Sequence, residues 1–134
     1  MIGSDTNILV RAVLDDEDSE SKLAKQFLKK VSEDKKLFIS SYAILEMVWV
    51  LKVKKQSRKD IYESVLDLLD SPGIVIGQRE VIVSALEMYI KGRADFGDYL
   101  ILAEGKLYDA PKLASFDKTF CKDNSRAQNP KKYL

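Results

Sequence analysis

Short apolar stretches alternate with segments of helical periodicity from one end of the chain to the other. The apolar stretches predict strands at residues 1–4, 37–40, 74–76 and 112–116, and the periodic segments predict helices at about 6–13, 19–31, 42–54, 59–70, 79–91 and 96–107. This alternation predicts an α/β fold in which helices cover both faces of a short, mostly parallel sheet of about four strands, an α/β/α sandwich.

Local signals mark several of the expected boundaries. Ser41 is a good N-cap for the helix that follows it, and Gly92 is a good helix stop. The acidic run Asp15–Glu20 has the composition of a solvated loop, and we assign it no chemistry. From about residue 121 the chain is polar, and this tail is expected to be irregular.

Composition is that of one ordinary globular domain, expected to span residues 1–134. Hydrophobic residues make up 46% and charged residues 32%, and no apolar run approaches the roughly 20 residues of a membrane span. The start of the sequence has no signal-peptide pattern. The single cysteine, Cys121, excludes an internal disulfide framework and suits a reducing compartment, so we expect a cytoplasmic protein without a membrane partner.

The absence of histidine narrows the possible chemistry. Without it the chain has no Ser-His or Cys-His nucleophile pair, no imidazole base and no histidine-containing zinc site. A hydrolase of this composition would depend on carboxylates, which hold hard cations such as Mg²⁺ or Mn²⁺. The net charge of +1 gives no global field, so a polyanion would need a local basic patch. The cluster Lys52–Lys59 is one such patch, although clusters of this kind are usually solvated.

Four acids stand in apolar surroundings near predicted sheet edges. Asp5 and Asp117 follow predicted strands, Glu46 is the only charged residue before Lys52 in an otherwise apolar helix, and Asp98 precedes the run Tyr99–Leu102. Because sites in parallel sheets lie at the carboxyl ends of strands, the four can share one edge. Like charges gathered there repel unless a cation neutralises them, and a divalent metal is the simplest answer.

Each acid also has a purely structural interpretation. Asp5 can cap the helix after it. Asp95 can cap the helix predicted at about 96–107, with Asp98 completing a variant of the capping box. Glu46 has only apolar helical neighbours, so it would need a distant base, and an ion pair with Arg11 is the alternative to a functional role.

Four motifs in order resemble the PIN domain, in particular the VapC-type ribonuclease toxins of toxin-antitoxin pairs. They are D-T-N at residues 5–7, a glutamate in an apolar helix after L-F-I-S-S, A-D-F-G-D-Y-L-I at 94–101, and S-F-D-K-T-F at 115–120. The resemblance covers nearly the whole chain. It implies an endoribonuclease whose acidic cluster holds Mg²⁺ or Mn²⁺ and which cleaves single-stranded or structured RNA.

Carried over by position, the resemblance assigns Asp5, Glu46 and Asp98 to the three core acids and Asp117 to the more variable fourth. All four are expected to act as catalytic and metal-binding residues. Asn7 matches the residue that orients the first acid, and Asp95 and Ser115 match supporting positions. The chain departs from the family pattern in a less apolar first strand and in the small Gly97 at the start of a helix, and neither change removes a ligand.

Two other functions remain open. A haloacid-dehalogenase-like phosphatase also places an acid after its first strand, but Asn7 stands where that enzyme class needs a second aspartate. A non-catalytic PIN-like module that binds RNA or protein is harder to exclude. The apolar stripes at residues 23–31 and 61–69 predict a groove for another helix. The resemblance implies that this partner is an antitoxin and that the chain forms a homodimer.

Overall fold

The computed structural model describes residues 1–14 and 16–134, so Asp15 of the predicted acidic loop lies outside the described residues. The chain forms two compact units, Met1–Arg79 and Glu80–Leu134. The first contains β1 (Ile2–Ser4), α1 (Thr6–Leu14), α2 (Ser19–Asp34), β2 (Leu37–Ile39), α3 (Ser41–Val53), α4 (Arg58–Asp70) and β3 (Ile74–Ile76). Apart from its first residue, α5 (Arg79–Lys91) belongs to the second unit.

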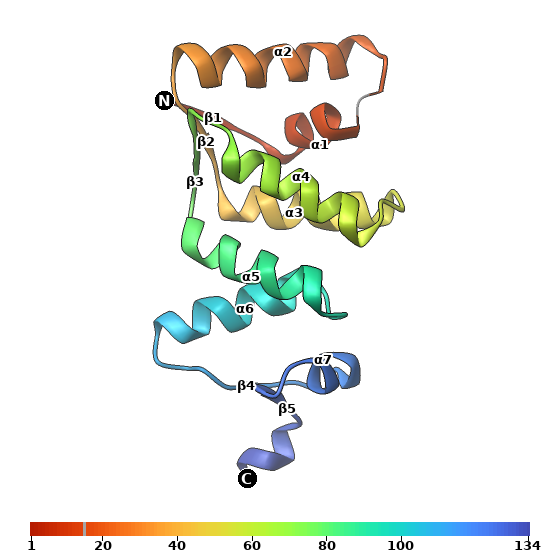
Figure 1. Cartoon of the computed structure of the whole chain (residues 1–134), viewed down its shortest axis with the longest axis vertical. Coiled ribbons are helices and arrows are strands. Elements are labelled where there is room, and N and C mark those ends of the chain that lie inside the picture. Colours follow the sequence, from red (N-terminus) through yellow and green to blue (C-terminus); the bar gives the residue numbers. More distant parts are fainter. Residues whose placement is uncertain (15) are drawn as a thin grey trace. The chain divides into compact units, whose positions relative to one another are not determined.

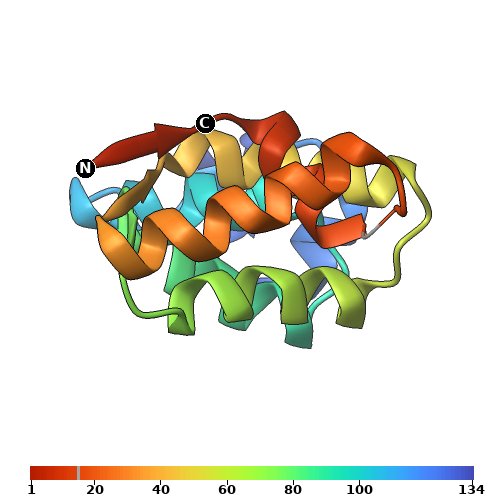
Figure 2. The same ribbon diagram turned by 90° about the horizontal axis from the view of Figure 1, so that it is seen from above.

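The first unit is built on a three-stranded parallel sheet in the order β1-β2-β3. Leu37 of β2 is in register with Ile2 on one side and Ile74 on the other. In Figures 1 and 2, α1 lies beside α2 and α3 lies beside α4, and these helix pairs are in contact. Parallel strands need crossover connections, and the helices supply them while burying the sheet.

The core of the first unit comes from the apolar positions that the periodicity singled out. Its fully buried side chains, each at most 1% exposed, are Leu9, Leu37, Ile39, Ile44, Met47, Leu51, Ile61 and Val65. Two serines start the helices around this core. Ser40 accepts a hydrogen bond from the Tyr42 amide (3.1 Å) and Ser57 accepts one from the Asp60 amide (3.0 Å). The prediction that Ser41 caps α3 is therefore wrong by one residue.

The second unit continues with α6 (Phe96–Leu107), β4 (Leu113–Ala114), α7 (Lys118–Asp123), β5 (Ala127–Gln128) and the 3₁₀ turn Pro130–Tyr133. Two perpendicular aromatic contacts lie in its interior, Tyr89 with Phe96 (5.7 Å between ring centroids) and Tyr99 with Phe120 (5.8 Å). Edge-to-face pairs at such distances are favourable because the positive ring edge meets the negative face.

The C-terminal tail is not irregular, contrary to the sequence-based expectation. Residues 118–123 form α7, and β5 pairs with β4 in parallel, with Leu113 opposite Ala127. The predicted fourth strand therefore exists as β4, and its described ladder partner is β5. Each strand is only two residues long, which explains why periodicity revealed neither the pairing nor β5.

All six predicted helices and all four predicted strands are present, with ends shifted by a few residues. Every described strand pairing is parallel, which confirms the predicted α/β class. No helix among the described residues is long and apolar enough to cross a membrane.

Candidate functional site

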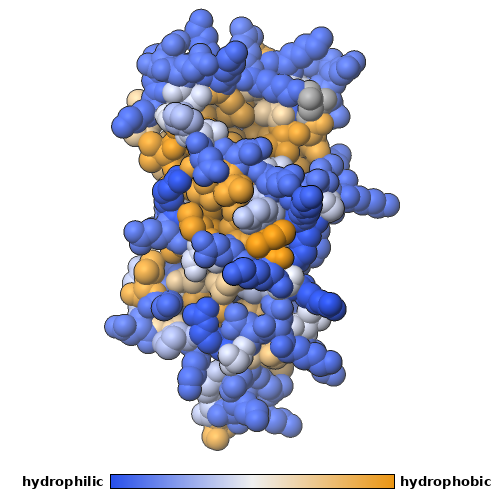
Figure 3. All heavy atoms as spheres, viewed as in Figure 1, coloured by the Kyte–Doolittle hydropathy of each residue, from blue (hydrophilic) through white to orange (hydrophobic). Residues whose placement is uncertain are grey.

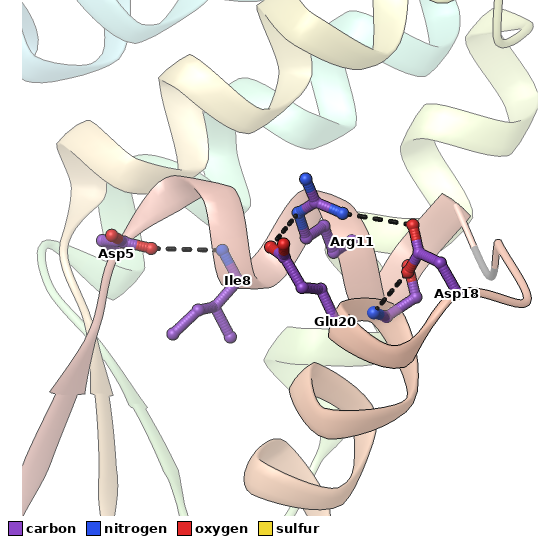
Figure 4. Close-up of polar contacts among 6 residues, drawn as sticks. Asp5, Ile8, Arg11, Asp18 and Glu20 are labelled. Carbon is purple, nitrogen blue, oxygen red and sulfur yellow. Dashed lines mark hydrogen bonds and ion pairs between the residues drawn. The ribbon is translucent and has the colours of Figure 1, made fainter.

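Asp5 stands at the carboxyl end of β1, directly before α1. Its Oδ1 accepts a hydrogen bond from the Ile8 amide (3.1 Å), as Figure 4 shows, so the capping interpretation is confirmed. The Asp5 side chain is exposed nonetheless. A cap uses one carboxylate oxygen, so this role is compatible with binding a cation through the other.

Glu46 lies in the second turn of α3 and accepts a hydrogen bond from Thr6 Oγ1 at 3.1 Å. Thr6 is the residue after Asp5, and α1 packs against α3, so the two predicted acids lie on neighbouring segments at the carboxyl ends of β1 and β2. Sequence reasoning missed the role of Thr6. Its position between Asp5 and Asn7 in the D-T-N motif was the available signal.

Two expectations about Glu46 are wrong. Glu46 is not enclosed by apolar residues, because it is exposed together with Tyr42, Trp49 and Val53 on α3. The ion pair with Arg11 does not form either. Arg11 Nη1 instead contacts Asp18 Oδ2 and its Nε contacts Glu20 Oε2, both at 3.3 Å (Figure 4).

The described residues 16–20 are all exposed, as the charge run predicted, and they also shape the start of α2. Asp18 is the N-cap of that helix, and its Oδ1 accepts from the Ser21 amide at 2.8 Å. Hydrogen bonds from the Ser21 amide and side chain, with the nearby Arg11 charge, hold the pKa of Asp18 below its ordinary value of 3.8. Arg11 thereby links the end of α1 to the start of α2.

Asp95 and Asp98 begin α6. Asp95 is the N-cap residue, but its side chain makes no capping hydrogen bond, so the predicted carboxylate cap is wrong. Its backbone carbonyl accepts from the amides of Asp98 (3.0 Å) and Tyr99 (3.4 Å) instead. Asp98 is half-buried beside the fully buried Tyr99, which agrees with the expected position at the edge of a core.

Asp117 and Ser115 form a short hydrogen-bonded series after β4. Ser115 Oγ accepts from the Asp117 amide, and Asp117 Oδ1 accepts from the Phe120 amide, both at 3.0 Å. The Ser115 amide in turn donates to the Gln128 carbonyl at 2.9 Å. Ser115 therefore supports the backbone at Asp117, and β5 supports Ser115.

The candidate acids are divided between the units, with Asp5 and Glu46 in the first and Asp98 and Asp117 in the second. Within residues 1–14 and 16–134, no group of three or more Asp, Glu or Cys side chains is placed to hold a metal ion. The donor chemistry nonetheless suits one, because every candidate ligand is a carboxylate and hard divalent cations prefer oxygen. The convergence of all four acids stays a prediction.

Two grooves among the described residues of the first unit have partly apolar linings. One of about 440 Å³ runs between α2 and α4, where Figure 3 shows apolar side chains gathered in a hollow. Its lining includes Ala12, Val13, Leu28, Leu68 and Ile74, with Lys25 and Asp67 among the polar residues. The other, of about 320 Å³, is lined by Asn7 and Arg11 of α1 and by Leu23 and Phe27 of α2. Asn7 itself is exposed.

Comparisons with known proteins support the family resemblance that these motifs indicated. The family described as "PIN domain" matches residues 4–123, a span that includes all seven predicted site residues. The chain is also 29% identical over 128 residues to a protein described as "VapC ribonuclease" from Aquifex aeolicus (strain VF5), with 94% of each chain covered. Because the family match extends over far more than half of the chain, and because the fold has the parallel α/β architecture that the motifs predicted, this protein belongs to the PIN-domain family.

Proposed function

We propose that this protein is a metal-dependent endoribonuclease of the VapC type, acting as the toxin of a toxin-antitoxin pair. The observation that carries the proposal is the link between Glu46 and the Asp5 segment through Thr6, in a PIN-family chain that resembles a VapC ribonuclease along 94% of its length. The hydrogen bond joins two of the acids that the motif order assigns to the site.

A divalent cation suits this set of residues. Asp5, Glu46 and Asp98 would hold it, with Asp117 as the fourth acid and with Asn7, Asp95 and Ser115 in supporting positions. Mg²⁺ or Mn²⁺ bound by such acids supplies an activated water and neutralises charge at a phosphodiester. The residues themselves have defined tasks. Thr6 fixes the orientation of the Glu46 carboxylate, and the Ile8 amide fixes that of Asp5.

The residue type at position 7 and the absence of histidine favour a nuclease over the phosphatase alternative. Asn7 occupies the place where a haloacid-dehalogenase-like phosphatase needs a second aspartate. The chain also has no histidine to replace that acid as a general acid or base. A non-catalytic PIN-like module that binds RNA or protein is the remaining alternative, and it predicts no metal-dependent cleavage.

The test measures cleavage of single-stranded and hairpin RNA with Mg²⁺ or Mn²⁺, with and without EDTA. Asp5→Asn, Glu46→Gln and Asp98→Asn should each lower cleavage by orders of magnitude while the melting temperature stays level or rises, because each change removes like-charge repulsion. Asn at position 5 keeps the helix cap, so a loss of activity there separates charge from capping.

Glu63→Gln on α4 is the matched control, since it removes an exposed helical glutamate outside the motifs. Its activity should equal that of the wild type. Cleavage that survives chelation would contradict the proposal, and so would Asp5, Glu46 and Asp98 variants that lose stability yet keep metal-dependent activity. A wild-type protein that binds RNA without cleaving it would favour the non-catalytic module.

The groove between α2 and α4 is suited to bind a helix of a partner protein. If the protein is a toxin, as proposed, this partner is its antitoxin. Its apolar floor and polar rim suit an amphipathic helix. Leu28→Asp should prevent co-purification with the product of a neighbouring reading frame while leaving RNA cleavage unchanged. A homodimer belongs to the same proposal, and sedimentation of the purified protein tests it.

A further inference from the structure

The exposed face of α3 carries two aromatic rings on either side of the candidate catalytic glutamate. Tyr42 is 77% exposed, Trp49 is 67% exposed and Val53 is 61% exposed. Successive residues of an α-helix are rotated by about 100° about its axis, so the side chains of these three residues and of Glu46 leave the helix within an arc of about 60°. We call these four residues the α3 stripe.

Large exposed aromatic side chains on one helical face need an explanation, since most of their surface is left uncovered by the chain itself. Tyr42 and Trp49 lie about 10 Å apart along the helix axis, with Glu46 between them. Base–aromatic stacking needs an accessible ring face and tolerates any base. The α3 stripe offers two such rings beside a carboxylate of the proposed site.

Charge at the end of the same helix favours a polyanion. Lys54 and Lys55 directly follow α3, and both are exposed, as is Lys59 at the start of α4. Lysines at such a position contact phosphates of a strand whose bases lie on the neighbouring rings. Aromatic and basic residues thus occur together where one strand of nucleic acid can meet both.

A second copy of the chain fits this surface less well. An apolar partner covering the α3 stripe would also bury Glu46, and an ionised carboxylate without a paired charge costs several kcal/mol to bury. A strand of RNA leaves that carboxylate in water or on a cation. Its phosphates would repel Glu46 alone, but the cation of the proposed function removes that repulsion.

We propose that Tyr42 and Trp49 form a stacking platform that holds the nucleobases of single-stranded RNA on either side of Glu46, with Lys54 and Lys55 contacting the phosphates. This inference rests on the proposed function, because it places the bases relative to the proposed site. It assigns Tyr42 and Trp49 to substrate binding and to a preference for unpaired RNA, roles that the chemistry of cleavage does not require.

Trp49 is the only tryptophan in the chain, so its fluorescence reports directly on the platform. In EDTA, which prevents metal-dependent cleavage, single-stranded oligoadenylate should quench the emission of the Glu46→Gln variant in a saturable titration, because this variant lacks the charge that repels phosphates when no cation is bound. Inorganic polyphosphate, a polyanion without bases, should bind without comparable quenching. Fully paired RNA should quench weakly, because its bases are already stacked.

The variants separate stacking from charge. Trp49→Ala and Tyr42→Ala should each raise the KM for single-stranded RNA by about 5- to 150-fold, the usual worth of one stacked base, with little change in kcat. Trp49→Phe should recover much of the loss. Tyr108→Ala, which removes a comparably exposed ring (79%) from the end of α6, is the matched control and should leave KM unchanged.

The lysines are tested by the salt dependence of RNA binding. In the double variant Lys54→Gln and Lys55→Gln, the slope of log K against log salt concentration should become shallower by about 0.7 per lysine.

Two results would overturn the inference while the proposed function stands. One is metal-dependent cleavage whose KM is unaffected by Trp49→Ala and Tyr42→Ala, with no change of emission at saturating RNA. The other is emission that shifts with protein concentration alone, in step with dimerisation in sedimentation, which would assign the α3 stripe to a second copy. If RNA quenches Trp49 but the wild type never cleaves, the platform is supported and the catalytic proposal fails.

Discussion

The phenolic oxygen of Tyr99 lies between the Ala94 amide and the Asp123 carboxylate. It accepts a hydrogen bond from the buried Ala94 amide at 3.1 Å and donates one to Asp123 Oδ2. The ring itself is fully buried and packs edge-on against Phe120. One side chain in the first turn of α6 therefore joins the turn before this helix to the end of α7.

Removing that hydroxyl should destabilise the second unit. Tyr99→Phe leaves the ring in place but removes the acceptor of the Ala94 amide bond and the charge-assisted bond to Asp123, which should cost about 1–3 kcal/mol of unfolding free energy. Urea unfolding of Tyr99→Phe, Asp123→Asn and the double variant measures the loss and the coupling between the two residues. Tyr108→Phe, with its exposed ring, is the control. Additive effects of the two single changes would show that the pair is not coupled.

Gly92 should tolerate no side chain. A Cβ at this position would collide with Tyr99 Oη and with the Asp123 carboxylate. Gly92→Ala is thus expected to destabilise the protein by more than about 1 kcal/mol, whereas alanine in place of a glycine with an ordinary backbone conformation normally stabilises by about 0.4–1 kcal/mol. Thermal melting shows whether Gly92→Ala lowers or raises the stability of the protein. A variant as stable as the wild type would mean that the Tyr99–Asp123 contact relaxes without cost.

Thr6 should act through Glu46. Thr6→Val keeps the shape of the side chain but deletes the hydroxyl that orients the Glu46 carboxylate, so RNA cleavage should fall by about 10- to 100-fold, as for other residues that orient metal ligands. The melting temperature should change little because both groups are at the surface. Thr6→Ser should restore activity. Single-turnover cleavage at several Mn²⁺ concentrations provides the readout, and a fully active Thr6→Val would remove this role.

Acid should weaken the junction between α1 and α2. The pKa of Asp18 is lower in the folded protein than its ordinary value of 3.8, so its stabilising effect is complete above that pH and is lost as the pH falls through the folded pKa. Asp18→Asn keeps the cap and loses the charge beside Arg11. Its melting temperature should be lower than that of the wild type at about pH 7 and equal to it once the pH lies below the folded pKa of Asp18. A gap that persists in strong acid would exclude the charge as its cause.

The order of helices and strands was predictable because each segment has a recognisable pattern of apolar residues. Leu37–Ile39 and Ile74–Ile76 are unbroken apolar runs, and the helices repeat at their own spacing, so the parallel α/β class followed from pattern alone. The family motifs then pointed to seven residues, and the hydrogen bonds given above include side-chain bonds of Asp5, Glu46, Asp117 and Ser115.

Features decided by tertiary partners were beyond the reach of the sequence. The apolar residues of α3 predicted apolar surroundings for Glu46, but apolar residues are common on protein surfaces, and Trp49 is one of them. Arg11 had several acids within reach along the chain, and only the approach of α2 to α1 selects Asp18 and Glu20. The strand β5 is two residues long and is defined by its pairing with β4.

The pairing of β4 with β5 has a consequence for the timing of synthesis. Ser115, which supports Asp117, is held by the Gln128 carbonyl, so during synthesis this support is absent until the segment around residue 128 has emerged from the ribosome. In the proposed nuclease, the fourth acid would therefore gain its support after the other three acids have been synthesised. A chain that stops at Asn124 should accordingly show protease sensitivity at residues 113–117 and reduced cleavage, and a truncated chain as active as the full one would contradict this order of events.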